Sequence, residues 1–437
     1  MKKLLLALAL VALSSTARAS CTVPNTFVNG TVADANAVNA NFAAMAACIN
    51  AQTYPTTMST SKVLGNFTGV SGPPSPVIPP DGLRSKLING EMRVDQINGG
   101  AAENGIGAFG IYIIDRWQVN ASQSGQFNGG QNFGAVVPPP GFSNYLGFTV
   151  ASSFTPGLTD YFGVDQPLEG LMMTDLGFGT AAAQSFGLSF WTYSTSITGT
   201  FGGSFCNYAG TRCYAFTYTI PNANTWTYNE VIIPGDSSGV WVGASNAGAA
   251  FLNFGLGAGA TQEITAGAWQ TTGGPNGTAF PQPSATVNPV STGGESWYLT
   301  GVQLEAGGII SAFEHRPFSI DLFQSQRYYQ CSYDYGTVAG TATTIGTVSM
   351  YLSPLVSATY SGQASVTFGT SMRGPPSLTV YSVATGAAGK IRDISNGVDV
   401  AAGASETGRN GFVQTATMSG ASTALRMQFQ WCVAAQL

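Results

Sequence analysis

The chain has 437 residues, of which only 8% are charged, and its formal net charge is −5. Ordinary globular proteins have roughly 25% charged residues, and an acidic balance argues against nucleic-acid binding through a basic face. Glycine, asparagine, threonine, serine and aromatic residues fill the difference. This composition predicts stacked β-structure with tight turns and disfavours a helical enzyme rich in titrating groups.

Residues 1–19 have the pattern of a secretory signal peptide. Two lysines precede an apolar run over residues 4–13, and the sequence Ala-Arg-Ala ends at Ala19. The run is too short to span a bilayer. Cys21 suggests a lipoprotein, but the residues before it lack the usual aliphatic side chain. We expect cleavage after Ala19, which changes the formal charge to −8, and an exported chain without a membrane span.

Residues 20–68 are predicted to be an N-terminal helical segment for attachment or association. Thr31 and Asp34 resemble a capping box at its start. Apolar residues then recur as a heptad stripe, at Ala35, Val38, Phe42, Met45 and Ile49. The stripe fits a small helix packed on its own domain, and the alternative is a self-association seam at the base of a fibre.

Residues 69–86 are predicted to be a Pro-rich linker. Five prolines lie between Pro73 and Pro80. Proline favours the polyproline II conformation, so these residues would span roughly 25 Å as a semi-rigid spacer.

The rest of the chain is predicted to be mainly β. Residues 87–320 are expected to form a jelly-roll-like β-sandwich, because strand-like runs are separated by Gly, Pro and Asn and no sequence repeat is visible. Residues 321–437 are expected to form a smaller C-terminal β domain that opens with a short helical turn. Its last strand, "LRMQFQWCV", alternates apolar and mostly polar residues. The runs of the large domain cover 186–196, 214–220, 228–236 and 295–307.

The six cysteines are spaced as three disulfides, which suits an exported protein. The spacing suggests the pairs Cys21–Cys48, Cys206–Cys213 and Cys331–Cys432. Because no CxxC pair occurs, a redox or zinc site is not indicated.

His315 is the only histidine, so any Ser-His-Asp triad would have to use it. In an extended "FEHRPF" segment, Glu314 and Arg316 point to one face and His315 to the other, so the adjacent acid cannot orient the ring. We therefore expect an incidental, partly exposed histidine and no catalytic set. Neither a metal cluster nor a cofactor is indicated. A carboxylate-pair glycosidase and a calcium ion held by loop oxygens both stay open.

Aromatic residues fall into two groups. Trp117, Trp191, Trp226 and Trp297 lie in strand-like runs and are expected in the core. Exposed rings in loops stack on sugar faces. The candidate ligand-binding residues in Gly/Pro-rich loops are Phe142, Tyr145, Tyr161, Phe162 and Tyr208.

Several stretches, in a fixed order, resemble the tail-fibre or receptor-binding proteins of tailed bacteriophages. They run from residue 21 to about 381. The matching stretches are "CTVPNTFVNGTVADANAVNANF" (21–42), "LINGEMRVDQ" (87–96), "IDRWQV" (114–119), "LEGLMMTDLGFGTAAAQSFGLSFW" (168–191), "NTWTYNEVIIPGD" (224–236), "TGVQLEAG" (300–307), "FEHRPFSIDLFQSQRYY" (313–329) and "MRGPPSLTVY" (372–381).

This resemblance implies a jelly-roll-like domain similar to carbohydrate-binding modules, a virion location and homotrimers, without a catalytic set to carry over. Two features depart from it. Where relatives often have Leu-Cys-Gln-Arg-Tyr-Tyr, this chain has Gln324, Ser325, Gln326 and Arg327. A signal peptide also differs from the cytoplasmic assembly usual for virion proteins.

The sequence as a whole leads to the hypothesis of a non-enzymatic tail-fibre-like virion adhesin. Its expected partners are a host cell-surface glycan, other phage tail or virion proteins and two further copies of the chain, with no nucleic acid. The expected location is extracellular and virion-associated. The alternatives are a secreted bacterial adhesin or carbohydrate-binding protein, a polysaccharide depolymerase and a purely structural fibre component.

Overall fold

A computed structural model describes most of the chain from Leu83 onward and short stretches before it. The described residues belong to two compact units, Met1–Gly82 and Leu83–Leu437. The predicted signal peptide, the side chains of the Cys21–Cys48 pair and most of the Pro-rich linker lie outside the described residues. These are 24–27, 34–51, 63–65, 75–77, 83–107, 109–273, 280–284, 286–352, 359–419 and 425–437.

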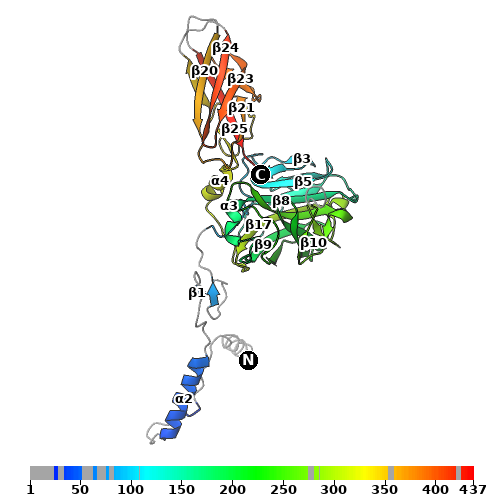
Figure 1. Cartoon of the computed structure of the whole chain (residues 1–437), viewed down its shortest axis with the longest axis vertical. Coiled ribbons are helices and arrows are strands. Elements are labelled where there is room, and N and C mark those ends of the chain that lie inside the picture. Colours follow the sequence, from blue (N-terminus) through cyan, green and yellow to red (C-terminus); the bar gives the residue numbers. More distant parts are fainter. Residues whose placement is uncertain are drawn as a thin grey trace, which may run out of the picture. The chain divides into compact units, whose positions relative to one another are not determined.

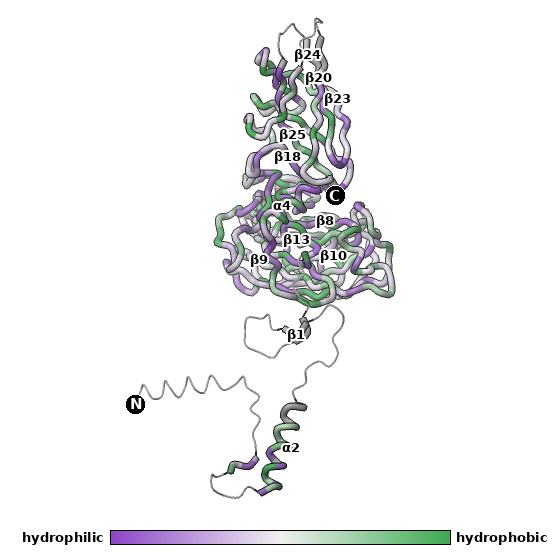
Figure 2. The backbone as a smooth tube through the Cα atoms, turned by 90° about the vertical axis from the view of Figure 1, so that its left-hand side faces the viewer, coloured by the Kyte–Doolittle hydropathy of each residue, from purple (hydrophilic) through white to green (hydrophobic). Residues whose placement is uncertain are grey.

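The first unit contains helix α2 (Ala35–Ala51). Asp34 caps it, because its Oδ1 accepts a hydrogen bond of 3.0 Å from the backbone N–H of Asn36. The cap therefore lies at Asp34, whereas the predicted capping box began at Thr31, outside the described residues. Hydrophobic and hydrophilic residues alternate along the helix (Figure 2). Within this unit, Phe42 and Met45 of the predicted stripe are 62% and 41% exposed.

Part of the predicted linker is a strand. Strand β2 (Ser75–Val77) pairs antiparallel with β1 (Val63–Gly65), with Pro76 opposite Leu64. Proline is compatible with this pairing because every strand of a two-stranded ribbon is an edge strand. The polyproline II conformation predicted for the linker is therefore replaced by a paired strand at these three residues.

In the second unit, two antiparallel sheets pack face to face as a jelly-roll-like sandwich (Figure 1). In the first sheet the strands run in the order β15 (Trp269–Thr271), β11 (Arg212–Ile220), β10 (Gly199–Asn207), β13 (Gly248–Ala258), β8 (Tyr161–Glu169), β5 (Trp117–Ala121) and β4 (Ile111–Ile114). In the second sheet they run β12 (Thr227–Ile233), β9 (Phe186–Ser194), β17 (Ser296–Ala306), β7 (Leu146–Val150), β6 (Phe127–Gln131) and β3 (Glu103–Ile106).

Short elements complete the sandwich. They are α3 (Gly170–Met173), η1 (Thr174–Leu176), η2 (Ala260–Gln262), η4 (Pro289–Ser291) and the parallel pair β14 (Glu263–Ile264) and β16 (Gln282–Pro283).

The core between the two sheets is rich in aromatic rings. Trp117 and Trp297 are buried there at 0% and 2% exposure, as predicted. Trp191 and Trp226 are only half-buried, contrary to the prediction. Trp226 precedes strand β12, and its ring packs with Tyr193 at a centroid distance of 5.4 Å. A strand-like run therefore does not by itself predict whether its tryptophan faces the core.

The C-terminal residues form a third antiparallel sheet built around β25 (Leu425–Ala434). Met427, Phe429, Trp431 and Val433 of this strand enter one core, as the alternation predicts. The predicted short helix is α4 (Phe318–Gln326). The remaining strands are β18 (Tyr329–Cys331), β19 (Val348–Leu352), β20 (Thr359–Thr367), β21 (Ser377–Ser382), β22 (Lys390–Asp393), β23 (Val398–Thr407) and β24 (Gly411–Ser419).

Two of the three expected disulfides are present in the described residues. Cys206 faces Cys213 across the β10–β11 hairpin, and Cys331 faces Cys432 across β18 and β25. Ser325 of α4, where the resemblance has a cysteine, is fully buried and its Oγ has no hydrogen-bond partner among the described residues. Of the helices in the described part of the chain, none combines the length and apolar character needed to cross a membrane.

Candidate functional site

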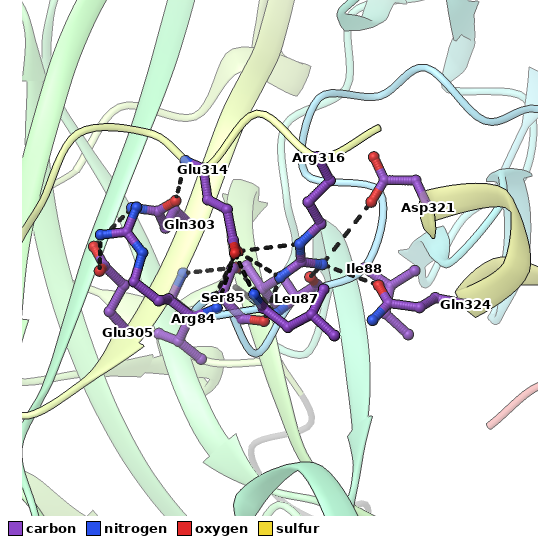
Figure 3. A network of polar contacts seen from close by, with 12 residues as sticks. Arg84, Ser85, Leu87, Ile88, Gln303, Glu305, Glu314, Arg316, Asp321 and Gln324 are labelled. Carbon is purple, nitrogen blue, oxygen red and sulfur yellow. Dashed lines mark hydrogen bonds and ion pairs between the residues drawn. The ribbon is translucent and has the colours of Figure 1, made fainter. Parts of the chain in front are cut away.

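The "FEHRPF" segment belongs to a polar network that joins residues 83–88 to strand β17 and helix α4 (Figure 3). We call it the junction network. The carboxylate of Glu314 accepts hydrogen bonds from the backbone N–H groups of Leu83, Arg84 and Ser85. Arg316 donates to Glu314 at 2.9 Å, which confirms that these two neighbours lie on one face and pair with each other.

Arg316 is the centre of this network. It is 8% exposed, and its guanidinium also donates to the carbonyl oxygens of Ser85 at 2.7 Å and Leu87 at 3.1 Å and to Gln324 at 3.0 Å. A buried guanidinium with this many acceptors holds several chain segments in one geometry. The junction network therefore has a structural role: it holds these segments of the fold together.

Burial by itself would raise the pKa of Glu314. The backbone N–H groups of Ser85 and Arg84 and the charge of Arg316 outweigh that effect and hold the pKa below its usual value. Glu314 is thus an ionised, fully engaged group, unsuited to giving or taking a proton near neutral pH.

A second feature is a cavity of about 470 Å³ at the outer face of the first sheet, here called the aromatic pocket. On β8, Phe162, Val164 and Leu168 point into the core, so Asp165 and Pro167 point outward. The pocket is lined by Phe109, Gly110, Gln118, Asp165, Pro167, Tyr208, Gly210, Phe251, Phe280 and Leu437.

Aromatic rings form the walls of this pocket. Phe109 is 65% exposed and Tyr208 is 43% exposed. Phe280 packs beside Phe109 and Phe251, with ring centroids 5.6 and 5.0 Å away, and Tyr161 packs on Phe280 at 5.4 Å. Exposed rings in a cavity of this size are suited to stacking on the apolar face of a small ligand.

Polar groups form its floor. Gln118 Nε2 donates a hydrogen bond of 3.0 Å to Asp165 Oδ2, and Asn120 Nδ2 donates to Oδ1. Burial raises the pKa of Asp165 to about 7, despite these donors and the opposing charge of Arg116. Near neutral pH this carboxyl group exists partly as the acid, so it can both donate a hydrogen bond to a hydroxyl group and accept one.

The conformation of the loop that carries Tyr208 is constrained by a disulfide and by hydrogen bonds. The Cys206–Cys213 disulfide closes it, and Asn207 Oδ1 accepts the backbone N–H groups of Thr211 at 2.8 Å and Arg212 at 3.1 Å. Gly210 supplies the left-handed conformation that the turn requires, with φ of 63°. Tyr208, one wall of the pocket, therefore belongs to a constrained hairpin.

The five aromatic residues that the sequence predicted as ligand-binding lie in different places in the structure. Tyr208 lines the aromatic pocket, and Tyr161 adjoins it through Phe280. Phe162 is buried in the core on β8 and Tyr145 packs beneath Tyr193 and Tyr298, so neither ring has a face free for a sugar. Phe142 lies elsewhere, against Phe313 at 5.0 Å.

Sequence reasoning missed Phe109, Gln118, Asp165, Phe251 and Phe280. The only signal was the run "YFGVDQPLE", in which an acid alternates with core residues along one strand. His315 was expected to be partly exposed, and its side chain is 51% exposed. Its partner was not foreseen, because Nδ1 contacts the carboxylate of Glu91, which is 224 residues away.

The described residues contain no cluster of three or more His, Cys, Asp or Glu side chains that could hold a metal ion. The turn "GPNGT" (274–278), whose oxygens could be offered to a calcium ion, lies outside the described residues. In "PGDSSG" (234–239), Asp236 is already paired with Arg212 at 2.8 Å and accepts a hydrogen bond from Trp241. That carboxylate is engaged in holding its own turn.

The chain matches no protein-family model and no curated protein. Similar solved structures include the enzymatically active domain of tailspike protein 4 of bacteriophage CBA120, with 14% identity and a TM-score of 0.28. That match covers 51% of this chain and about a fifth, 21%, of the tailspike chain.

Two carbohydrate-binding proteins are also similar. The family 11 carbohydrate-binding module of Clostridium thermocellum, solved with a mixed-linked tetrasaccharide, has 12% identity and a TM-score of 0.23 over 49% of this chain and 99% of its own. A putative sugar binding protein of Bacteroides thetaiotaomicron has 10% identity and a TM-score of 0.26 over 51% and 99%. At these TM-scores the similarities carry no functional conclusion.

Proposed function

We propose that this protein binds a glycan in the aromatic pocket without cleaving it. The observation that supports this most is the combination, in one cavity, of two exposed rings, Phe109 and the hairpin residue Tyr208, with the buried Asp165 and Gln118 at the floor. Ring faces stack on the C–H face of a sugar, and amide and carboxyl groups bind its hydroxyl groups. The lining contains no cationic side chain among the described residues, so a neutral sugar suits it better than an acidic one.

Binding is favoured over hydrolysis by the same geometry. Glycosidases of the common type need two carboxyl groups on opposite sides of the scissile bond. Asp165 is the one carboxylate side chain among the described residues that line the pocket. Release of reducing ends from host polysaccharide by the purified chain would instead establish the depolymerase alternative.

We further propose that the chain acts as a tail-fibre-like virion adhesin for a cell-surface glycan. The ordered motifs from residue 21 to about 381 support this assignment, and the exposed Phe42 and Met45 on α2 support a homotrimer. Several copies of one weak site give useful avidity. A native mass of three chains, and recovery of the protein with purified particles, are the expected results. A monomer free in the medium would favour a secreted bacterial adhesin.

Binding itself is tested with a glycan array and a pair of tyrosine variants of the full chain. Tyr208→Ala removes a pocket wall, whereas Tyr228→Ala removes a ring of similar exposure, 41%, from strand β12 of the second sheet. Truncation of an aromatic anchor costs about 1.4 kcal/mol or more, so Tyr208→Ala should lower affinity about tenfold or more. Tyr228→Ala should leave affinity unchanged. No binding to any glycan would support a purely structural fibre component.

A further inference from the structure

A cavity of about 460 Å³ lies beside His315, lined by residues that the aromatic pocket does not use. The imidazole ring packs near Phe142 and Phe313, with centroids 5.2 and 5.1 Å away, and about half of the side chain stays exposed. We call this cavity the His315 pocket. Its polar lining includes Glu91, Arg93, Gln131, Ser143, Asn144 and His315.

His315 is oriented by a partner from a distant part of the chain. Its Nδ1 contacts Glu91 Oε1, and Glu91 Oε2 is paired with Arg93 at 3.2 Å. Nε2 is therefore the ring nitrogen left for a ligand. It lies near Gly141, where a Cβ added to the glycine would be 3.7 Å from Nε2, so residue 141 has no side chain that covers this nitrogen.

Charges around this pocket are largely neutralised within the protein. Arg93 pairs with Glu91 and also donates to Asp321 at 2.9 and 3.0 Å, so two carboxylates surround one guanidinium. An anionic ligand gains little from such a cluster. A neutral ligand meets no unpaired charge that it would have to desolvate.

Uncharged hydrogen-bonding groups remain open to the pocket. The side chains of Ser143 and Asn144 form no hydrogen bond with another described residue. Gln131 Nε2 donates to the carbonyl oxygen of Met92 at 2.7 Å, which leaves its Oε1 available. Together with Nε2 of His315, these groups offer both donors and acceptors to hydroxyl groups.

We propose that the His315 pocket is a second binding site, which takes a neutral, hydroxyl-rich group such as one pyranose unit. Nε2 of His315 and the side chains of Ser143 and Asn144 bind its hydroxyl groups. This proposal does not depend on a ligand in the aromatic pocket.

Because the chain has one histidine, selective ¹³C labelling of histidine gives one Cε1–H signal in the NMR spectrum of the full chain. The probes are the methyl glycosides of glucose, galactose and mannose, with glucuronate as the charged comparison. A saturable shift of this signal with at least one neutral glycoside, and a weaker one with glucuronate, is expected. The same shift should persist in Tyr208→Ala, which lacks a wall of the other pocket.

A matched variant separates binding from structure. His315→Gln changes a half-exposed side chain and removes the imidazole signal, so its affinity is measured by calorimetry. The affinity for the active glycoside should be about tenfold lower, the loss expected for one hydrogen bond of about 1.4 kcal/mol. Binding of glycans at the aromatic pocket should stay as in the unmodified chain. The proposal fails if no neutral glycoside moves the imidazole signal, if glucuronate moves it equally, or if His315→Gln binds as tightly. The aromatic-pocket proposal is unaffected by any of these results.

Discussion

Glu314 and Asp165 are two carboxyl groups of the same unit that the fold treats in opposite ways. Glu314 accepts three backbone N–H groups and a guanidinium, so its pKa lies below the usual value. Asp165 is 1% exposed and accepts only neutral amide groups from Gln118 and Asn120, so burial raises its pKa to about 7. The Glu314 carboxylate stays ionised, and its hydrogen bonds hold chain segments together. The second remains able to exchange a proton beside a cavity, which is typical of a ligand site.

The largest expected effect comes from removing the cation of the junction network. Arg316→Met removes the cation that pairs with the Glu314 carboxylate and the donor to the carbonyl oxygens of Ser85 and Leu87. Breaking a buried ion pair in this way costs about 3 to 5 kcal/mol of unfolding free energy. Urea unfolding followed by tryptophan fluorescence measures the change.

The control is a more exposed ion pair of the same type. Arg392 pairs with Asp399 at 3.1 Å, with side-chain exposures of 23% and 17%. Arg392→Met should cost about 1 kcal/mol or less. Equal losses for the two variants would show that the junction network is no more important than a surface pair.

The second effect is a pH dependence of opposite sign at the two carboxyl groups. Below about pH 3.8 the Asp165 carboxyl group is protonated in both the folded and the unfolded state. Between about pH 3.8 and pH 7 it is ionised in the unfolded chain and still largely protonated in the folded one. Its contribution to stability is therefore lost as pH rises through this range. Asp165→Asn should remove this pH dependence. The total loss of unfolding free energy over the range is at most about 4 kcal/mol, at 1.4 kcal/mol per pKa unit.

Glu314 supplies the contrast. Its lowered pKa means that its contribution is present above the ordinary value of 4.5 and is lost as pH falls through the folded-state pKa. The difference in unfolding free energy between the unmodified chain and Glu314→Gln should thus shrink on acidification. For Asp165→Asn the difference should grow in the variant's favour between pH 4 and pH 7. If the two differences, each taken as the unmodified chain minus the variant, changed with pH in the same direction, the comparison would be contradicted.

The sequence predicted those features that depend on near neighbours. Alternation along "LRMQFQWCV" located the core face of β25, and the spacing of Glu314 and Arg316 placed both on one face. Cys206 and Cys213 could be paired because a short hairpin tip separates them. The two-residue period of an extended segment decides the first two outcomes and the short loop decides the third, all without knowledge of the whole sheet.

The aromatic pocket could not be predicted, because sheet order creates it. β5, β8 and β13 are neighbours in the first sheet although long segments separate them in the chain. Gln118 therefore lies beside Asp165, and Phe251 joins them from β13. Tyr145 and Phe162 were assigned to loops because glycines flank them, yet Phe162 falls on the core face of β8 and Tyr145 is covered by other rings. Glycine near an aromatic residue marks a turn only when the strand ends there.

The third effect, smaller than the other two, is expected at the disulfide that closes the Tyr208 loop. The Cys206–Cys213 disulfide closes a short loop, with a sequence separation of 7, that carries Tyr208 and Gly210. Cys206→Ala with Cys213→Ala should cost about 2.5 kcal/mol, the entropy of closing so short a loop. Because Tyr208 forms a pocket wall, glycan affinity should fall as well, although no ligand contact is removed. Affinity is measured by calorimetry well below the unfolding temperature. Unchanged affinity together with lowered stability would show that the hydrogen bonds of Asn207 are enough to hold Tyr208 in place without the disulfide.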